Sequence, residues 1–388
     1  MAVNKLDITM MEDVGTSANQ LLQRDGSGNM PAVNASQVSG LSEFTTSTSD
    51  PVITTNPSGG VGSLWYNKTS GEMYVCTDAT AGANVWTNVG EGTGDVQLKY
   101  RGDNYGFAQG AGITPASNVI DKWPFASDSN ATDHGDLVVY GTSRGAASGS
   151  DTHGYHLGGA SNGTGNVNNI QKYQFSTAGN SSDIADLVAG RHNNSGHNSA
   201  TYGYTSGGYA APLHNIEKHS FASDSNATTV GTLTVMHYGG GSNSSLTHAY
   251  HTGGSTTSEA DFNTIEKWSM VSDANATDVG DITGNRGQSG GTSSGDHGYI
   301  AGGYQGGATN IIERFPFATD SNGSDVGDLG AAEHGASGQS GPNHGYCAGG
   351  DNGGARNNIY KYAYASSGGG TDIADLTTAR HHCVGNQY

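Results

Sequence analysis

The feature that most constrains the fold is a unit that repeats six times between about residue 104 and the end of the chain. Each unit opens with a short aromatic segment that runs into small residues. The last aromatics of these segments are Phe107, Tyr155, Tyr204, Tyr250, Tyr299 and Tyr346, which are 48, 49, 46, 49 and 47 residues apart. A fixed period of this length indicates a repeat architecture in which each unit is one small supersecondary element.

The second half of each unit predicts a strand that is buried on both faces. In the first unit, Trp123 and Phe125 are two residues apart and share one face, whereas Ile120 faces the other side. A sheet needs two apolar faces when it is packed between two other sheets. A Gly-Gly pair, which permits unusual backbone angles, precedes this strand in five units. These pairs begin at Gly158, Gly207, Gly253, Gly302 and Gly349.

We therefore predict an all-β fold, a six-bladed β-propeller with one unit per blade. Only 33% of the 388 residues are hydrophobic and 63 are glycine, so the core must be thin and aromatic, which suits many small strands. The first unit lacks a matching inner strand before Tyr105. We expect the C-terminal segment 379–384 to complete this blade, which would remove the free sheet edges.

The units resemble the kelch repeat, which has an apolar strand, a Gly-Gly pair and then a spaced aromatic residue on the following strand. The resemblance covers about residues 100–388 and implies a kelch-like β-propeller. The tryptophan that kelch repeats carry on the last strand is missing, and Val230, Val279 and Val326 stand near its place. The functions of the kelch family therefore do not carry over.

The first hundred residues resemble bacteriophage proteins. Residues 17–41 combine a leucine pair, Asp-Gly-Ser-Gly, Pro-Ala-Val and Ser-x-Val-x-x-Leu. This combination is similar to a segment near the start of phage fibre proteins. Residues 64–89 look like a module of phage structural proteins and predict a three-stranded meander, in which Trp65, Tyr74 and Trp86 could stack.

The chain accordingly divides into three expected regions. Residues 1–60 have too few apolar groups for a core and form an extended virion-attachment or oligomerisation segment. Residues 61–97 form the small β-meander. Residues 98–388 form the six-bladed propeller, closed by the C-terminal strand.

The resemblances imply a virion structural protein, either a head or tail fibre or a decoration protein, which displays the propeller for host-surface adsorption. It would assemble in the host cytoplasm, bind other virion proteins through its N-terminal region, form oligomers in the virion, and recognise a host glycan or protein. Two alternatives stay open: a glycan-cleaving enzyme on a propeller scaffold, and a kelch-type interaction module.

Charge and composition exclude several other classes. The net charge of −19, without a basic stripe, argues against binding of nucleic acid. No stretch is long enough to span a membrane and no signal peptide is expected. Three cysteines argue against a disulfide framework. No catalytic motif is present, so we expect no enzyme activity and no cofactor.

Five residues are candidates for a ligand site. Each follows by four positions the leucine or isoleucine that ends a unit, and we expect them on inner strands near a central channel. They could contact an anionic sugar or a partner loop, or simply line the channel with water. They are Arg191, His237, Arg286, Glu333 and Arg380.

Two recurring patterns that suggest metal sites receive structural interpretations instead. The histidines of the His-Gly-Tyr and His-Ala-Tyr segments occupy equivalent places in different blades, too far apart for one ion, so we expect packing or turn roles. The Asp-Ser-Asn-Ala-Thr loops lack the closing glutamate and the glycine of calcium loops, so we interpret them as Asx turns. The cluster His381-His382-Cys383 is expected on the closing strand.

Overall fold

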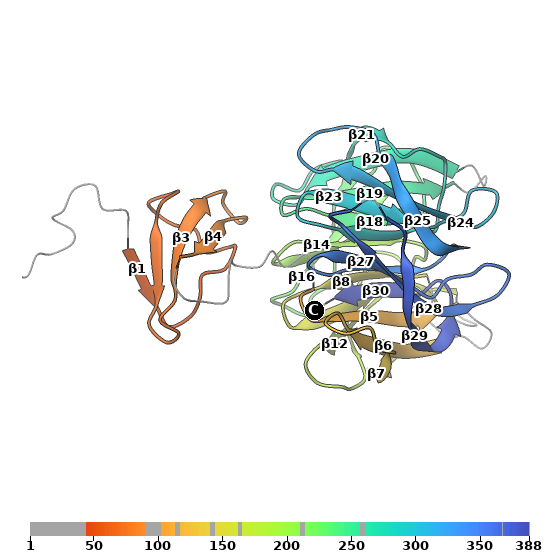
Figure 1. Ribbon diagram of the computed structural model, residues 1–388, viewed down its shortest axis with the longest axis horizontal. Helices are drawn as coiled ribbons and strands as arrows, with labels where there is room; N and C mark the ends of the chain where they lie inside the picture. Colours follow the sequence, from red (N-terminus) through yellow and green to blue (C-terminus); the bar gives the residue numbers. More distant parts are fainter. Residues whose placement is uncertain are drawn as a thin grey trace, which may run out of the picture. The chain divides into compact units, whose positions relative to one another are not determined.

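A computed structural model describes residues 44–89, 102–112, 117–139, 144–161, 165–209, 214–256, 261–366 and 368–387. These residues form strands, turns and loops, and none of them lies in a helix, so the fold is all-β. The chain divides into two compact units near residue 95 (Figure 1). No helix that could cross a membrane occurs in the described ranges.

The first unit contains one four-stranded sheet in the order β1-β2-β3-β4. Its strands are β1 (Phe44–Ser47), β2 (Leu64–Asn67), β3 (Met73–Asp78) and β4 (Val85–Asn88). The antiparallel strands β2, β3 and β4 confirm the predicted meander. The rings of Trp65 and Trp86 meet edge-on with centroids 5.9 Å apart, and Trp65 lies opposite Tyr74.

The sheet begins earlier than the sequence indicated, because β1 pairs with β2 in parallel. Two side chains hold the segment that follows β1. Asn84 Nδ2 donates to the carbonyl of Ile53 over 2.8 Å, and Trp86 Nε1 donates to the carbonyl of Thr55 over 3.1 Å. This part of the expected attachment segment therefore belongs to the small sheet. The rest of that segment, residues 1–43, lies outside the described residues.

The second unit contains six four-stranded sheets, one for each repeat. We number them 1 to 6 in repeat order. In each sheet, the inner strand contacts the inner strands of two neighbouring sheets, and the outer strand is at the opposite edge.

Their strands follow from inner to outer. Sheet 1 has β30 (Val384–Gln387), β5 (Tyr105–Ala111), β6 (Ser117–Pro124) and β7 (Thr132–Asp136). Sheet 2 has β8 (Ala146–Gly149), β9 (His153–Leu157), β12 (Asn169–Gln174) and β13 (Ser182–Asp186). Sheet 3 has β14 (Ser195–Asn198), β15 (Tyr202–Ser206), β16 (Asn215–Ser220) and β17 (Thr228–Thr232). Sheet 4 has β18 (Gly241–Ser244), β19 (His248–Ser255), β20 (Asp261–Ser269) and β21 (Thr277–Asp281). Sheet 5 has β22 (Gly290–Ser293), β23 (His297–Ala301), β24 (Thr309–Pro316) and β25 (Ser324–Glu333). Sheet 6 has β26 (Ser337–Ser340), β27 (His344–Ala348), β28 (Arg356–Ala363) and β29 (Thr371–Arg380). A small hairpin, β10 (Ala160–Ser161) with β11 (Gly165–Asn166), extends from sheet 2.

Sheet 1 is assembled from both ends of the second unit, as expected. The C-terminal strand β30 pairs antiparallel with β5, from Val384 opposite Gln109 to Gln387 opposite Gly106. The pairing is confirmed, but the strand starts at Val384, where the predicted segment 379–384 ends. The preceding residues belong to β29 and to the turn after it.

The core lies between consecutive sheets. One apolar cluster joins Trp123 and Phe125 of sheet 1 to Tyr346 and Ile359 of sheet 6, and another joins Phe107 of sheet 1 to aromatic residues of sheet 2. Phe125 stacks on Tyr346 with ring centroids 4.5 Å apart. The prediction that the third strand is apolar on both faces is therefore confirmed. The Gly-Gly pairs all have positive φ, for example 65° and 112° at Gly158 and Gly159.

Candidate functional site

Three of the five candidate residues, Arg191, His237 and Arg286, lie in the connections between sheets, whereas Glu333 and Arg380 end the outer strands β25 and β29. Each stands four residues before the start of an inner strand, as Arg191 stands before β14 at Ser195. All five side chains are buried, and none lines the main cavity of the second unit. The sequence predicted them on inner strands at a channel, whereas the structure places them ahead of the inner strands and buries their side chains.

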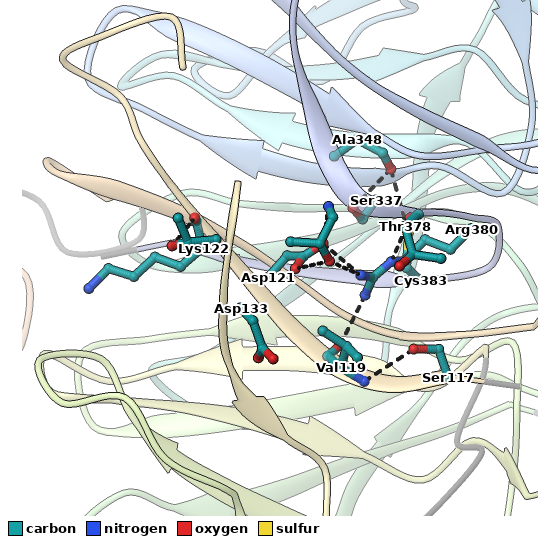
Figure 2. A network of polar contacts seen from close by, with 12 residues as sticks. Ser117, Val119, Asp121, Lys122, Asp133, Ser337, Ala348, Thr378, Arg380 and Cys383 are labelled. Atoms are coloured by element: carbon teal, nitrogen blue, oxygen red, sulfur yellow. Dashed lines mark hydrogen bonds and ion pairs between the residues drawn. The ribbon is translucent and has the colours of Figure 1, made fainter. Parts of the chain in front are cut away.

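Four of the five contact an acid that follows the buried isoleucine of the next sheet, and the three arginines form ion pairs with it. Figure 2 shows one of them, where Arg380 lies 2.6 Å from Asp121 and also donates to the carbonyl of Val119. The other pairs are Arg191 with Glu217, His237 with Glu266 at 3.1 Å, and Arg286 with Glu313 at 2.9 Å. These pairs bond each connection to the following sheet, which gives the side chains a structural role.

Glu333 is the exception among the five. Glu333 stands where the other four interfaces have a basic residue, and Tyr360 stands where sheet 6 would have the acid after its buried isoleucine. This pair of positions therefore contains no basic side chain. Burial raises the pKa of Glu333 to about 7. The sheet interfaces therefore keep the same pair of positions while the chemistry of the pair varies.

The residues of both metal-like patterns make other polar contacts, and Asn130 Oδ1, which was expected in an Asx turn, accepts from the N–H of Asp375 in sheet 6. His153 Nδ1 lies 2.8 Å from the hydroxyl of Thr152, and His248 Nδ1 lies 2.8 Å from that of Thr247. Asp128, in one of the calcium-like loops, pairs with Lys361 of sheet 6 at 2.8 Å. No group of three or more metal-ligating side chains occurs within the described ranges.

One cavity lies where the six inner strands meet, and we call it the main cavity because all six sheets contribute to its lining. It has a volume of about 130 Å³ and is lined mostly by small and polar residues, including Ser242 and Ser293. Contributions come from every inner strand: β8, β14, β18, β22, β26 and β30. The described lining residues include no aspartate and no glutamate.

A ring of backbone hydrogen bonds surrounds this cavity. Its members are Arg144, Asn193, Gly239, Gln288, Gly335 and His382, and all six line the cavity. The backbone N–H of each member donates to the carbonyl of the preceding member, and the N–H of Arg144 donates to the carbonyl of His382, which closes the ring. One of these bonds joins the N–H of Asn193 to the carbonyl of Arg144, and the other five have N···O distances of 2.5 to 2.9 Å. We call these six residues the ring residues.

All ring residues adopt the left-handed backbone conformation. Their φ values lie between 54° and 70°, which is costly for residues other than glycine or asparagine. Arg144, Gln288 and His382 nevertheless occupy the ring, with φ of 57°, 56° and 55°. The sequence carries only a weak signal for the ring: each member after the first lies two residues beyond a buried candidate residue, as Asn193 does after Arg191.

A network of side chains lies beside the ring. Gln288 Oε1 lies 2.9 Å from His382 Nε2 and 3.0 Å from His334 Nδ1, so we assign N–H donors to both nitrogens. His381 Nδ1 lies 2.5 Å from His382 Nδ1, so it donates in turn to the remaining acceptor. Burial first, and then the nearby Arg144 and histidines, lower the pKa of His382 to about 2. Burial also lowers the pKa of His334 and His381, so the three histidines of this network are neutral at pH 7.

The fold and the site together define an all-β protein of repeated four-stranded sheets with a polar, acid-free cavity where the sheets meet. No family model matches the chain, and no curated protein matches it. Among solved structures, the chain is similar to that of YjhT, with a TM-score of 0.53 and 12% sequence identity. The match covers 66% of this chain and 93% of the YjhT chain. This likeness concerns the fold alone.

Proposed function

We propose that the six sheets form a closed, six-bladed kelch-like β-propeller. The supporting observation is the ring of hydrogen bonds, which passes through all six repeats and returns from His382 to Arg144. The pairing of β30 with β5 and the contact of β30 with β8 fit the same arrangement. Closure removes sheet edges that would otherwise invite aggregation.

Class averages from electron microscopy of the isolated chain would test this architecture. We expect views along the axis with six wedges. Five or seven wedges, or an open arc, would be incompatible with the proposed propeller.

We further propose that the chain is a bacteriophage virion structural protein that displays this propeller for adsorption to a host surface or for decoration of the particle. The proposal depends on the phage-like segments at residues 17–41 and 64–89. A rigid scaffold that carries variable loops is a common basis for recognition. In this function the small N-terminal sheet and the residues before it attach the chain to other virion proteins.

The main cavity bears on the glycan-cleaving alternative. Cleavage of a glycosidic bond usually requires two carboxyl groups about 5–10 Å apart on either side of the bond. The described lining of the cavity offers none. We therefore favour binding and display over catalysis, and we expect no release of reducing sugar from host-surface polysaccharide incubated with the purified chain.

Immunoelectron microscopy of purified virions tests the virion role. Antibody against this chain should label the particles, either on the capsid or on the tail, and that position would decide between the head and tail versions. An absence of label from both, with the same antibody detecting the chain in the infected cell, would reject the virion assignment.

A further inference from the structure

We propose that the main cavity binds a small oxyanion at the ring residues, with Arg144 as its principal ligand and the side-chain amide of Gln288 as a second donor. This site goes beyond the display function and does not depend on it. Four observations carry the inference: the lack of a partner for Arg144, its costly backbone conformation, the orientation of Gln288, and the absence of acids from the lining.

Arg144 differs from the buried arginines of the sheet interfaces. Arg191, Arg286 and Arg380 each pair with a carboxylate. The guanidinium of Arg144 has no carboxylate or other hydrogen-bond acceptor among the described residues, although it is only partly exposed and lines the cavity. Burial lowers the pKa of Arg144, and only Tyr238 acts in the opposite direction. A partly buried cation without an anion is unfavourable, and a bound oxyanion would compensate its charge.

The backbone at Arg144 points to a functional side chain. Glycine occupies two of the six ring positions and asparagine a third, and these residues tolerate a left-handed conformation best. Arg144, Gln288 and His382 fill the other three positions, where this conformation is costly, with φ of 57°, 56° and 55°. Strained residues of this kind concentrate at ligand sites, where the side chain is needed in one direction.

Gln288 is held so that its amide can donate to a ligand. Its Oε1 accepts hydrogen bonds from both His382 and His334, which fixes the orientation of the side-chain amide. The Nε2 group then remains as a donor without a described partner, on a residue that lines the cavity. An amide donor and a guanidinium fork together suit the oxygens of a carboxylate, phosphate or sulfate group.

The charge of the surroundings makes this site distinctive. The chain carries a net charge of −19, yet the described lining of the cavity contains an arginine and no acidic residue. Asp351, whose Oδ2 lies 4.0 Å from His381 Nδ1, does not line the cavity. The overall negative field repels anions, so binding here must depend on local contacts with Arg144 and Gln288.

The test is calorimetric titration of the full chain with sodium phosphate, acetate, glucuronate and glucose at constant ionic strength. We expect saturable binding of the oxyanions, with a Kd of about 1 mM or tighter. Tighter binding of glucuronate than of acetate would identify an acidic sugar as the source of the anion. Equal or tighter binding of phosphate or acetate would identify a free anion. Binding of none of the oxyanions, or binding of glucose as tight as that of glucuronate, would overturn the proposal.

Two variants separate a specific site from general charge effects. Arg144→Asn keeps a residue that tolerates positive φ, as Asn193 does in the same ring, so the fold should be unaffected. We expect it to weaken oxyanion binding at least tenfold. The matched control, Lys172→Asn, removes one positive charge from an outer ion pair with Asp224 and should leave binding unchanged. Equal weakening by both variants, with unchanged melting temperatures, would show that no specific site exists.

Discussion

Acid should unfold the second unit, because several of its histidines are buried in neutral form. Burial lowers the pKa of His156 and His219 to about 4, of His197 to about 3 and of His382 to about 2. His251 is fully buried and its pKa is also well below the ordinary value. In the unfolded chain the same groups titrate near pH 6.5. The unfolded state therefore binds more protons below that pH.

The sign and size of the effect follow from proton linkage. These histidines impose no penalty above about pH 6.5, and stability is lost as the pH falls from there toward the folded pKa values. Each histidine costs roughly 2 kcal/mol at about pH 5, because one pKa unit corresponds to about 1.4 kcal/mol. The four histidines with a stated pKa together cost roughly 8 kcal/mol, an amount comparable to the whole stability of a typical domain, and His251 acts in the same direction.

Buried acids act in the opposite direction, because burial raises the pKa of Asp121, Glu217 and Glu333. The pKa of Glu333 is raised to about 7, so its folded form gains a proton before its unfolded form does as the pH falls. For Glu333 this gain offsets roughly 3 kcal/mol of the loss at about pH 5. The net loss from the groups with a stated pKa is therefore about 5 kcal/mol, still large enough for unfolding to begin between about pH 6 and pH 5.

Urea titrations at about pH 8, 7, 6 and 5, followed by circular dichroism, would measure this loss. The variant His156→Thr should reduce the slope of the unfolding free energy with pH by about one proton. Threonine is a reasonable replacement because Thr205 stands at the equivalent position of sheet 3. An unfolding midpoint that is equal at pH 8 and pH 5 would refute the reasoning.

Three further predictions concern the architecture. Arg286→Met should lower the unfolding free energy by about 3–5 kcal/mol in a urea titration, because it leaves Glu313 buried without its basic partner. A double variant that adds Glu313→Gln should recover much of this loss. No recovery would contradict the ion-pair explanation. Gly338→Ala should lower the unfolding free energy by roughly 1–3 kcal/mol in the same assay, because the added Cβ would overlap the backbone of Gly291. The control Gly307→Ala should be nearly neutral, because its Cβ meets open space. Equal effects of the two variants would argue against close packing of the inner strands. Deletion of residues 384–388 removes β30 and exposes the edge of β5, so size-exclusion chromatography should detect aggregation. A monomer with an unchanged melting temperature would contradict the closing role of β30.

Much of the fold could be predicted from the sequence because local chemistry repeats. The spacing of Ile120, Trp123 and Phe125 indicates a strand with two apolar faces, and the structure buries all three. The positive φ of the Gly-Gly pairs and the pairing of the C-terminal strand with β5 were also expected. In contrast, β1 was missed, because a short polar strand such as Phe-Thr-Thr-Ser carries no hydrophobic period.

What the sequence by itself determined is the repeat, the all-β character and the composition of each sheet, since these depend on residues close together in the chain. Only the tertiary structure decided which polar groups meet. Arg380 and Asp121 are 259 residues apart, yet they form a buried pair, and Arg144 and His382 come together in the ring from opposite ends of the second unit. The candidate basic residues looked like ligands because sequence spacing does not reveal a partner on the next sheet. Arg144 stood out only once its lack of a described carboxylate partner, its backbone angle and its place in the cavity could be compared with those of the other arginines.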